Sequence, residues 1–178
     1  MNSKISDFGL VKLFRMDQTQ GNTKRIVGTY GYMAPEYAIT GHFSVKSDVF
    51  SFGVLVLEIV TSQKSMLFAG PQFEEALLHR AWRLWSVEKV SDLMDLGLAS
   101  RYKEEEATKC IHIALLSIQE DPGRRPKMST VVRALNGDSI SLPVPKAPQF
   151  LFNFTDLGDE KASSSYSLPP SISSLYPR

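Results

Sequence analysis

Two motifs decide the fold of this chain: Asp7-Phe8-Gly9 and, after a mainly polar stretch, Gly28-Thr29-Tyr30-Gly31-Tyr32-Met33-Ala34-Pro35-Glu36. Taken alone, Asp7-Phe8-Gly9 is equally compatible with a simple turn after a short strand at residues 4–6, because glycine at position 9 allows the backbone conformations that a turn requires. An Ala-Pro-Glu sequence at this distance after an Asp-Phe-Gly sequence is rarely accidental. The distance between the two motifs is therefore stronger evidence for the fold than either motif alone.

Length and composition indicate one soluble domain. The chain has 178 residues, of which 43% are hydrophobic and 22% charged, as is ordinary for a globular protein. The charges of its 20 basic and 19 acidic residues nearly cancel, so the chain lacks the excess of positive charge that nucleic-acid binding usually requires. Gly28 and Gly31 match the Gly-x-x-Gly loop of an RNA-binding domain, but no basic surroundings support that alternative.

The cysteine and histidine content argues against a disulfide or a metal site. Cys110 is the single cysteine, which fits a reducing compartment, and its apolar neighbours indicate a buried, inert thiol. The three histidines are scattered without carboxylate or thiolate neighbours at ligand spacing. The most apolar run, 49–60, is too short for a membrane span and contains Glu58. We therefore expect a soluble, intracellular chain with no membrane segment.

Hydrophobic periodicity predicts helices through most of the remaining chain. The stretch 44–62 is apolar nearly all round, with Ser44 or Ser47 as its N-cap, so we expect it at the centre of the fold. Further helices are predicted in four places: a short one that starts at Ala34-Pro35-Glu36, an amphipathic pattern within 63–98 whose Trp82 and Trp85 face the core, one over 104–118, and one capped by Ser129 that ends at Leu135.

The composition changes at Gly137. Prolines and runs of serine dominate from there to the end of the chain, so this tail buries too little apolar surface to offset its ordering entropy. We expect residues 137–178 to form a disordered Ser/Pro-rich tail. Its three phenylalanines, Phe150, Phe152 and Phe154, are the residues able to lie back on the helical body.

Four stretches resemble the eukaryotic protein kinases, and more narrowly the plant receptor-like serine/threonine kinases of the cysteine-rich and S-domain groups. They are residues 4–10, 28–37, 112–122 and 125–132, and the resemblance runs from residue 2 to about residue 135. It implies a mainly α fold: a partial helical C-lobe of a kinase domain over residues 1–136, with at most a short N-terminal strand.

The resemblance implies a role for several residues of the polar loop. Asp7 matches the aspartate that binds the Mg²⁺ bridging the ATP phosphates. Thr29 matches a threonine that faces the substrate and is typical of serine/threonine kinases. Thr23, followed by Lys24 and Arg25, resembles the regulatory phosphorylated threonine, with Thr19 as a weaker candidate. A solvated loop with unmodified threonines is the alternative.

Three further residues are implied as structural anchors. Glu36 matches a glutamate that pairs with a buried arginine near the end of the domain, and Arg125 matches that arginine. Two surface charges that never meet are the alternative. Asp48 matches an aspartate that accepts hydrogen bonds from the backbone of the catalytic loop, although it could also simply favour the start of its helix.

The remaining parts of a kinase are not found in the sequence. There is no glycine-rich loop, no ATP-binding lysine and no His-Arg-Asp sequence, so we expect the isolated chain to be inactive and to bind neither ATP nor Mg²⁺. The sequence is interpreted as a C-lobe without its N-lobe and catalytic loop.

Three hypotheses stay open. The first is half of a serine/threonine kinase that uses ATP and Mg²⁺. The second is a non-catalytic, pseudokinase-like interaction module, and the third is a partial gene product without an independent role. The expected partners are protein substrates or a partner kinase. The expected location is the cytoplasm, or the cytoplasmic face of the plasma membrane for a full-length receptor-like kinase.

Overall fold

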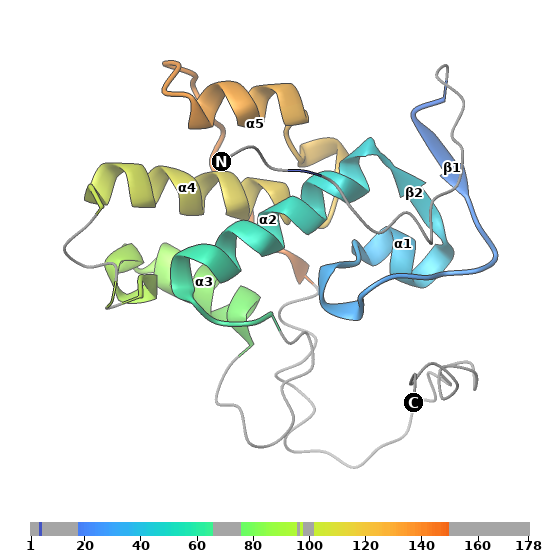
Figure 1. The fold of residues 1–178 in the computed structure, drawn as a ribbon, viewed down its shortest axis with the longest axis horizontal. Coiled ribbons are helices and arrows are strands. Elements are labelled where there is room, and N and C mark those ends of the chain that lie inside the picture. Colours follow the sequence, from blue (N-terminus) through green and yellow to red (C-terminus); the bar gives the residue numbers. More distant parts are fainter. Residues whose placement is uncertain (1–3, 5–17, 66–75, 96, 98–101, 150–178) are drawn as a thin grey trace, which may run out of the picture.

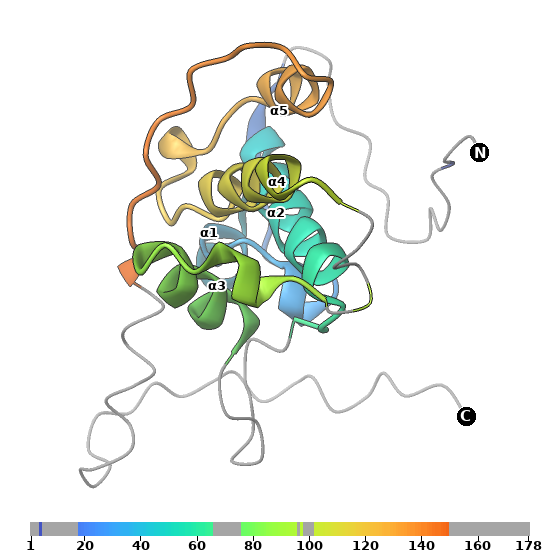
Figure 2. The ribbon, with the colours of Figure 1, turned by 90° about the vertical axis from the view of Figure 1, so that its left-hand side faces the viewer.

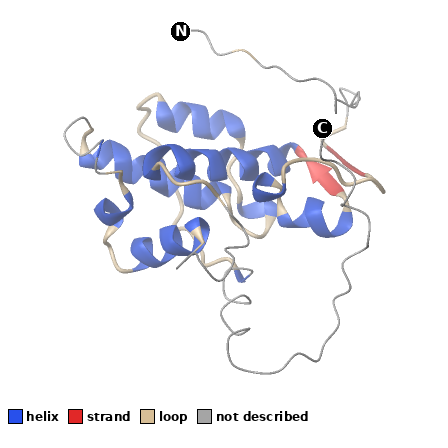
Figure 3. Ribbon diagram, turned by 60° about the horizontal axis from the view of Figure 1, so that its bottom comes forward, coloured by secondary structure: helices blue, strands red, loops and turns tan. Residues whose placement is uncertain are grey.

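The computed structural model describes residue 4 and residues 18–65, 76–95, 97 and 102–149. Within this part the chain is mainly helical, which confirms the predicted fold class (Figures 1 and 3). In chain order the elements are β1 (Gln20–Asn22), the 3-10 turn η2 (Tyr30–Tyr32), α1 (Pro35–Thr40), β2 (His42–Ser44), α2 (Val45–Thr61), α3 (Leu77–Ser86), the 3-10 turn η3 (Val90–Leu93), α4 (Glu104–Ser117), the 3-10 turn η5 (Pro122–Arg124) and α5 (Met128–Leu135).

Helix α2 is the central element, as its apolar pattern predicts. Ser44 starts it with a capping box: the Ser44 hydroxyl accepts a hydrogen bond from the Lys46 amide, and the Ser47 hydroxyl accepts one from the Ser44 amide, each at 3.1 Å. Both candidate caps therefore act together. In Figure 1, α2 runs through the middle of the molecule, with α4 beside it and α1 and β2 at its N-terminal end.

Close contact between α2 and α4 depends on Gly53. A Cβ atom at this position would lie 2.7 Å from the Cβ of Ser117 and 2.9 Å from the carbonyl oxygen of Ala114. The two backbones can approach this closely because the position has no side chain. The interface joins residues more than fifty positions apart into one hydrophobic core. Its fully buried members from α2, α3 and α4 include Phe50, Val54, Leu57, Leu78, Ala81, Ile111, Ala114 and Leu115.

Helix α3 carries the predicted tryptophan pair. Its inner face is buried, and Trp82 and Trp85 pack, partly buried, against the main core. The Trp85 ring also lies 5.0 Å from the His112 ring of α4, measured between centroids. Packing is thus the structural use of both tryptophans.

A two-stranded antiparallel sheet, which the sequence did not predict, ties the polar loop to the start of α2. β1 pairs with β2 in the register Gln20 with Ser44 and Asn22 with His42. Next to it, the Thr23 amide donates to the Gly41 carbonyl at 2.9 Å, and Gly41 has a φ of 70°. A Cβ at Gly41 would lie 2.0 Å from the Thr23 carbonyl oxygen, so only glycine fits this turn. The strand predicted at residues 4–6 lies outside the described residues except for Lys4, which has no regular secondary structure.

The predicted N-cap of the last helix is wrong. Helix α5 begins at Met128 with Lys127 as its N-cap residue, and Ser129 lies inside the first turn. The Lys127 carbonyl already accepts hydrogen bonds from the amides of Thr130 and Val131, at 2.9 and 3.1 Å. The N-cap residue therefore lies two positions before Ser129, whose side chain favoured a cap.

The first part of the predicted disordered tail is ordered. Residues 140–149 run back along the edge of the helical body from α5 toward the α3 end (Figure 2). Ile140 and Leu142 pack against Ile113, Val131 and Ala134 in a second hydrophobic cluster. The tail beyond this segment, including the three phenylalanines, lies outside the described residues.

Candidate functional site

The site is built around a buried ion pair between α1 and the segment before α5. Arg125 is 1% exposed, and its guanidinium meets the Glu36 carboxylate through two parallel hydrogen bonds. Nη1 lies 2.7 Å from Oε1, and Nη2 lies 2.8 Å from Oε2. This bidentate geometry is the strongest form of arginine–carboxylate contact. The structure thus brings Glu36 and Arg125 together across 89 positions of sequence. We call this pair the anchor.

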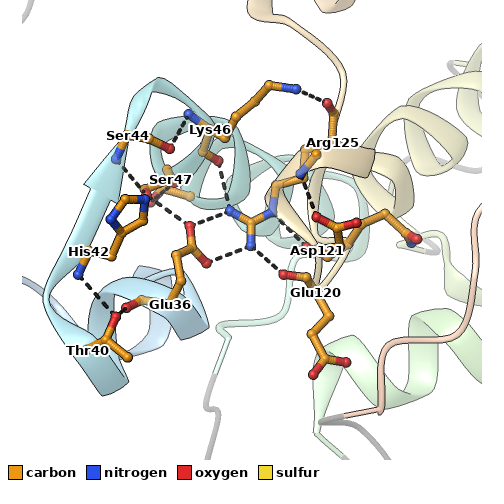
Figure 4. A network of polar contacts seen from close by, with 12 residues as sticks. Glu36, Thr40, His42, Ser44, Lys46, Ser47, Glu120, Asp121 and Arg125 are labelled. Carbon is orange, nitrogen blue, oxygen red and sulfur yellow. Dashed lines mark hydrogen bonds and ion pairs between the residues drawn. The ribbon is translucent and has the colours of Figure 1, made fainter. Parts of the chain in front are cut away.

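The remaining donors of Arg125 are also used, as Figure 4 shows. Nε donates to the Gln119 carbonyl at 2.7 Å, Nη1 also donates to the Lys46 carbonyl at 3.0 Å, and Nη2 also donates to the Glu120 carbonyl at 3.1 Å. The guanidinium carbon lies 5.1 Å from the centre of the Phe50 ring. A buried cation is tolerated only with this kind of complete pairing.

The chemistry around the anchor shifts two pKa values. Burial alone would raise the pKa of Glu36, but the hydrogen bonds and charge of Arg125, together with a bond from the Ser47 hydroxyl at 2.9 Å, hold it below its ordinary value. Burial, followed by the charges of Arg125 and Lys127, lowers the pKa of Lys46. The Lys46 ammonium donates to the Arg125 carbonyl. Lys46, at the start of α2, therefore contacts both the side chain and the backbone of Arg125.

A second attachment, missed by the sequence reading, fixes the loop before α1. The Tyr32 hydroxyl donates to Oε2 of Glu58 at 2.6 Å, and the other oxygen of Glu58 accepts from the Ser65 amide. The hydrogen bond to Glu58, then burial, raises the pKa of Tyr32. The Ser51 hydroxyl donates to the Tyr32 carbonyl at 2.7 Å. We call the Tyr32–Glu58 contact the latch.

Tyr32 of the latch also lines a cavity of about 520 Å³. Thr29 and Asp48, two of the predicted site residues, both line it, together with Thr23, Arg25, Tyr32, Met33, Tyr37 and Ser51 among others. Thr29 is exposed at the start of η2, and its hydroxyl makes no capping bond. Asp48 lies in the first turn of α2.

The Asp48 carboxylate is an acceptor without a donor in the described part of the chain. It makes no hydrogen bond there, although the residue lines the cavity; Asp48 is exposed, and desolvation by the surrounding protein raises its pKa. Helix α2 is capped by Ser44, so the helix start does not depend on Asp48. The arrangement leaves a carboxylate and the Thr29 hydroxyl available on one cavity wall.

The two candidate phosphorylation sites differ in their surroundings. The Thr23 hydroxyl accepts a hydrogen bond from the Arg25 amide at 3.2 Å and donates to the Arg25 carbonyl at 3.1 Å, which forms a local turn. Lys24 and Arg25 are exposed beside it. Thr19 is exposed, and its carbonyl accepts from the Val45 amide at 3.3 Å.

Asp7, the implied Mg²⁺ ligand, lies outside the described residues. Residues 4, 18–65, 76–95, 97 and 102–149 contain no group of three or more histidine, cysteine or acidic side chains that could hold a metal ion.

Cys110 is half-buried, and burial, with a smaller effect of Glu106, raises the pKa of its thiol. Among the helices in the described ranges, none combines the length and the apolar character that a membrane span requires.

The chain is similar to known proteins over most or all of its length. The family model of protein tyrosine and serine/threonine kinases matches residues 1–135. Cysteine-rich receptor-like protein kinases 6 and 8 of Arabidopsis thaliana are 48% and 46% identical over the whole chain, which spans 28% of each relative's length. Cysteine-rich receptor-like protein kinase 7 of the same plant is 51% identical over 84% of the chain, which corresponds to 23% of that relative.

Proposed function

Because the chain belongs to the protein tyrosine and serine/threonine kinase family, we propose that it forms the substrate-facing, helical half of a serine/threonine kinase domain. In the complete domain the reaction is transfer of the ATP γ-phosphate to serine or threonine hydroxyls of protein substrates. Its relatives are receptor-like kinases, so the proposed location is the cytoplasmic face of a membrane.

One observation carries this proposal: Thr29 and Asp48 line the same cavity, and the loop that carries Thr29 leads directly into the latch at Tyr32 and the anchor at Glu36. Positioning is most of what a protein contributes to phosphoryl transfer, because the reacting groups must be held in line. A fixed loop with a free threonine hydroxyl suits the binding of an acceptor segment.

Each residue has a distinct proposed role. Thr29 would orient the acceptor hydroxyl, and Asp48 would accept hydrogen bonds from a backbone segment that enters the cavity. Glu36 and Arg125 position the loop without contacting the substrate. ATP and Mg²⁺, the cofactors that kinases of this family use, would supply the phosphoryl group, with Asp7 as a metal ligand.

Thr23 is the proposed regulatory site. Its hydroxyl lies in an exposed turn that Arg25 closes, so a phosphate there would replace two neutral hydrogen bonds with a dianion beside two exposed cations. Phosphorylation of Thr23 should therefore rearrange the cavity rim. Thr19 is the weaker candidate because its neighbours in the sequence, Gln18 and Gln20, are not basic.

Exposed apolar side chains on α2 favour association with a further polypeptide. Val45, Leu55 and Ile59 are 58%, 45% and 63% exposed, although α2 is the central helix of the described residues. A surface of this kind is typical of a binding interface. The polypeptide is either the rest of a kinase domain in the same protein or a separate partner kinase.

The decisive experiment is a chimera. The kinase region that precedes Asp-Phe-Gly in cysteine-rich receptor-like protein kinase 6 is fused to this chain at Asp7, and phosphorylation of matched serine, threonine and tyrosine peptides is measured. We expect activity on the serine and threonine peptides and none on the tyrosine peptide. The Thr29→Ala variant should lose at least about 100-fold in kcat/KM, and Thr29→Ser should retain most of it.

Two results would overturn the proposal. One is a folded chimera that phosphorylates no peptide although it binds ATP. The other is equal activity of the Thr29→Ala variant and the parent chimera. The isolated chain serves as the reference, and we expect it to transfer no phosphate from labelled ATP.

A further inference from the structure

Residues 140–149, which we call the C-terminal strap, are buried in a regular pattern. Pro145 and Pro148 are buried and Leu142 is partly buried, whereas the residues between them are exposed, Val144 by 82%. From Leu142 onward the inward positions are therefore three apart, whereas Ile140, which also packs inward, lies two positions before Leu142. This spacing is the period of a polyproline II helix, which has three residues per turn and leaves its backbone groups free for other partners.

The side chain of Gln119, which lies just after α4, binds the backbone amide and carbonyl of Lys146 in the strap. Gln119 is 3% exposed, so its amide group requires partners inside the protein. Its Oε1 accepts from the Lys146 amide at 3.1 Å, and its Nε2 donates to the Lys146 carbonyl at 2.8 Å and to the Leu115 carbonyl at 3.0 Å. Gln119 thus recognises the backbone of Lys146 and not its side chain.

Two more contacts hold the strap on either side of Lys146. His112 Nε2 lies 2.8 Å from the Pro143 carbonyl and must be the donor, because a carbonyl only accepts. Oε2 of Glu120 accepts from the Gln149 amide at 2.8 Å. All three contacts are made to backbone atoms, and two of them use residues next to each other in the chain.

The same two residues also hold the anchor. The side chains of Gln119 and Glu120 bind the strap, while their carbonyl oxygens accept hydrogen bonds from Nε and Nη2 of Arg125. Loss of the strap would remove both hydrogen bonds between the Gln119 side chain and the Lys146 backbone. The peptide units that bind Arg125 would then lose their support.

We propose that α4 and the turn after it form a docking surface for an extended, proline-containing segment, that residues 140–149 are its ligand within the same chain, and that docking stabilises the Arg125–Glu36 anchor. This inference concerns a region beyond residues 1–135, where the family match ends. It does not depend on phosphoryl transfer.

Hydrogen exchange of the full chain tests the proposal. Lys146→Pro keeps the polyproline II preference but removes the amide that Gln119 binds. We expect exchange of the Gln149 amide to become about tenfold faster or more, with a smaller acceleration at the Arg125 amide, which donates to the Pro122 carbonyl.

The matched control is Ala147→Pro. Ala147 is exposed, and its amide has no hydrogen-bond partner among the described residues, so exchange at both amides should change less than about twofold. The proposal is overturned if Lys146→Pro leaves either amide unchanged, or if the two variants have equal effects.

A peptide experiment provides an independent readout. In the variant Leu142→Ser/Pro145→Ser/Pro148→Ser of the 178-residue chain the inward side chains of the strap are removed, and a labelled synthetic peptide of residues 139–149 is added. We expect saturable binding to this variant and at least about tenfold weaker binding to the intact chain, whose own strap competes at high effective concentration. A peptide with proline in place of Lys146 should bind at least about tenfold more weakly. Equal binding to both chains, or no saturable binding to the variant, contradicts the docking surface.

Discussion

The anchor and the latch hold the same loop to α2 and its neighbours but by different chemistry. In the anchor, the arginine side chain is 0% and the glutamate side chain 15% exposed, and every donor of Arg125 is used. In the latch, a phenol donates to a carboxylate in a partly buried position. Removal of one anchor residue leaves a buried charge, whereas removal of the latch hydroxyl leaves a carboxylate that water can reach. The anchor should therefore dominate the stability of the loop.

The largest effect is expected for Arg125→Met. The variant leaves Glu36 without its cation, so the free energy of unfolding should fall by about 3–5 kcal/mol in urea denaturation. The neighbouring Arg124→Met is the matched control, because Arg124 is half-exposed and its 3.6 Å pair with Asp121 lies at the surface. We expect a change below about 1 kcal/mol there. Equal losses in the two variants would show that burial of the Arg125 guanidinium does not determine its contribution to the free energy of unfolding.

The pH dependence follows from the lowered pKa of Glu36. A group whose pKa is lower in the folded than in the unfolded chain stabilises the fold above its ordinary value, 4.5 here, and this contribution is lost as the pH falls through the folded value. Stability should therefore decline below about pH 4.5 more steeply in the parent chain than in Glu36→Gln. Parallel stability curves would contradict the assigned role of the ion pair.

The latch should make a smaller contribution. Tyr32→Phe removes one hydrogen bond, and we expect a loss of about 0.5–1.5 kcal/mol in the free energy of unfolding. In a double-mutant cycle with Glu58→Gln, the two changes should be clearly less than additive. The raised pKa of Tyr32 implies that its contribution is present below pH 10 and is lost as the pH rises through the folded value. Additive losses would indicate that the two side chains do not interact.

The smallest effect is expected for Ser51→Ala. This substitution removes the 2.7 Å hydrogen bond to the Tyr32 carbonyl, but the partly buried carbonyl can bind water instead. Thermal unfolding should show a loss of less than about 1 kcal/mol. A larger loss than for Tyr32→Phe would mean that the backbone bond, and not the phenol, holds this end of the loop.

The sequence predicted the helices well because their signals are local. The apolar pattern of 44–62 and the proline at the start of α1 were sufficient to place α2 and α1. Ser129 shows the limit of local signals, since a competing cap residue two positions earlier starts the helix. Element type was predictable, and the exact cap was not.

The anchor was predicted from the sequence, whereas the latch and the β1–β2 sheet were not. Glu36 and Arg125 could be named only because the surrounding motifs resemble those of kinases, since no local pattern connects residues 89 positions apart. Glu58 was noticed only as a charge within an apolar run, and its pairing with Tyr32 depends on the loop geometry. The β1–β2 sheet was missed because each strand has three residues and pairs across a long loop.

The strap was missed for a physical reason. Its proline-rich composition favours disorder, and the number of apolar side chains is indeed small. Burial at every third position, together with the polar groups of Gln119 and Glu120, provides the order that composition did not indicate. A period of three between Leu142, Pro145 and Pro148 is the signal in the sequence that could have found it.

The central claim is that the anchor fixes the loop that carries Thr29 and helix α1, which follows it. Its most direct test is hydrogen exchange at the Ala38 amide of α1, which donates to the Ala34 carbonyl at 2.9 Å, compared between the parent chain and Arg125→Met. We predict at least about tenfold faster exchange at Ala38 in the variant, and a smaller acceleration at the Ile118 amide in the core. Equal acceleration at both amides, or none at Ala38, would contradict the account.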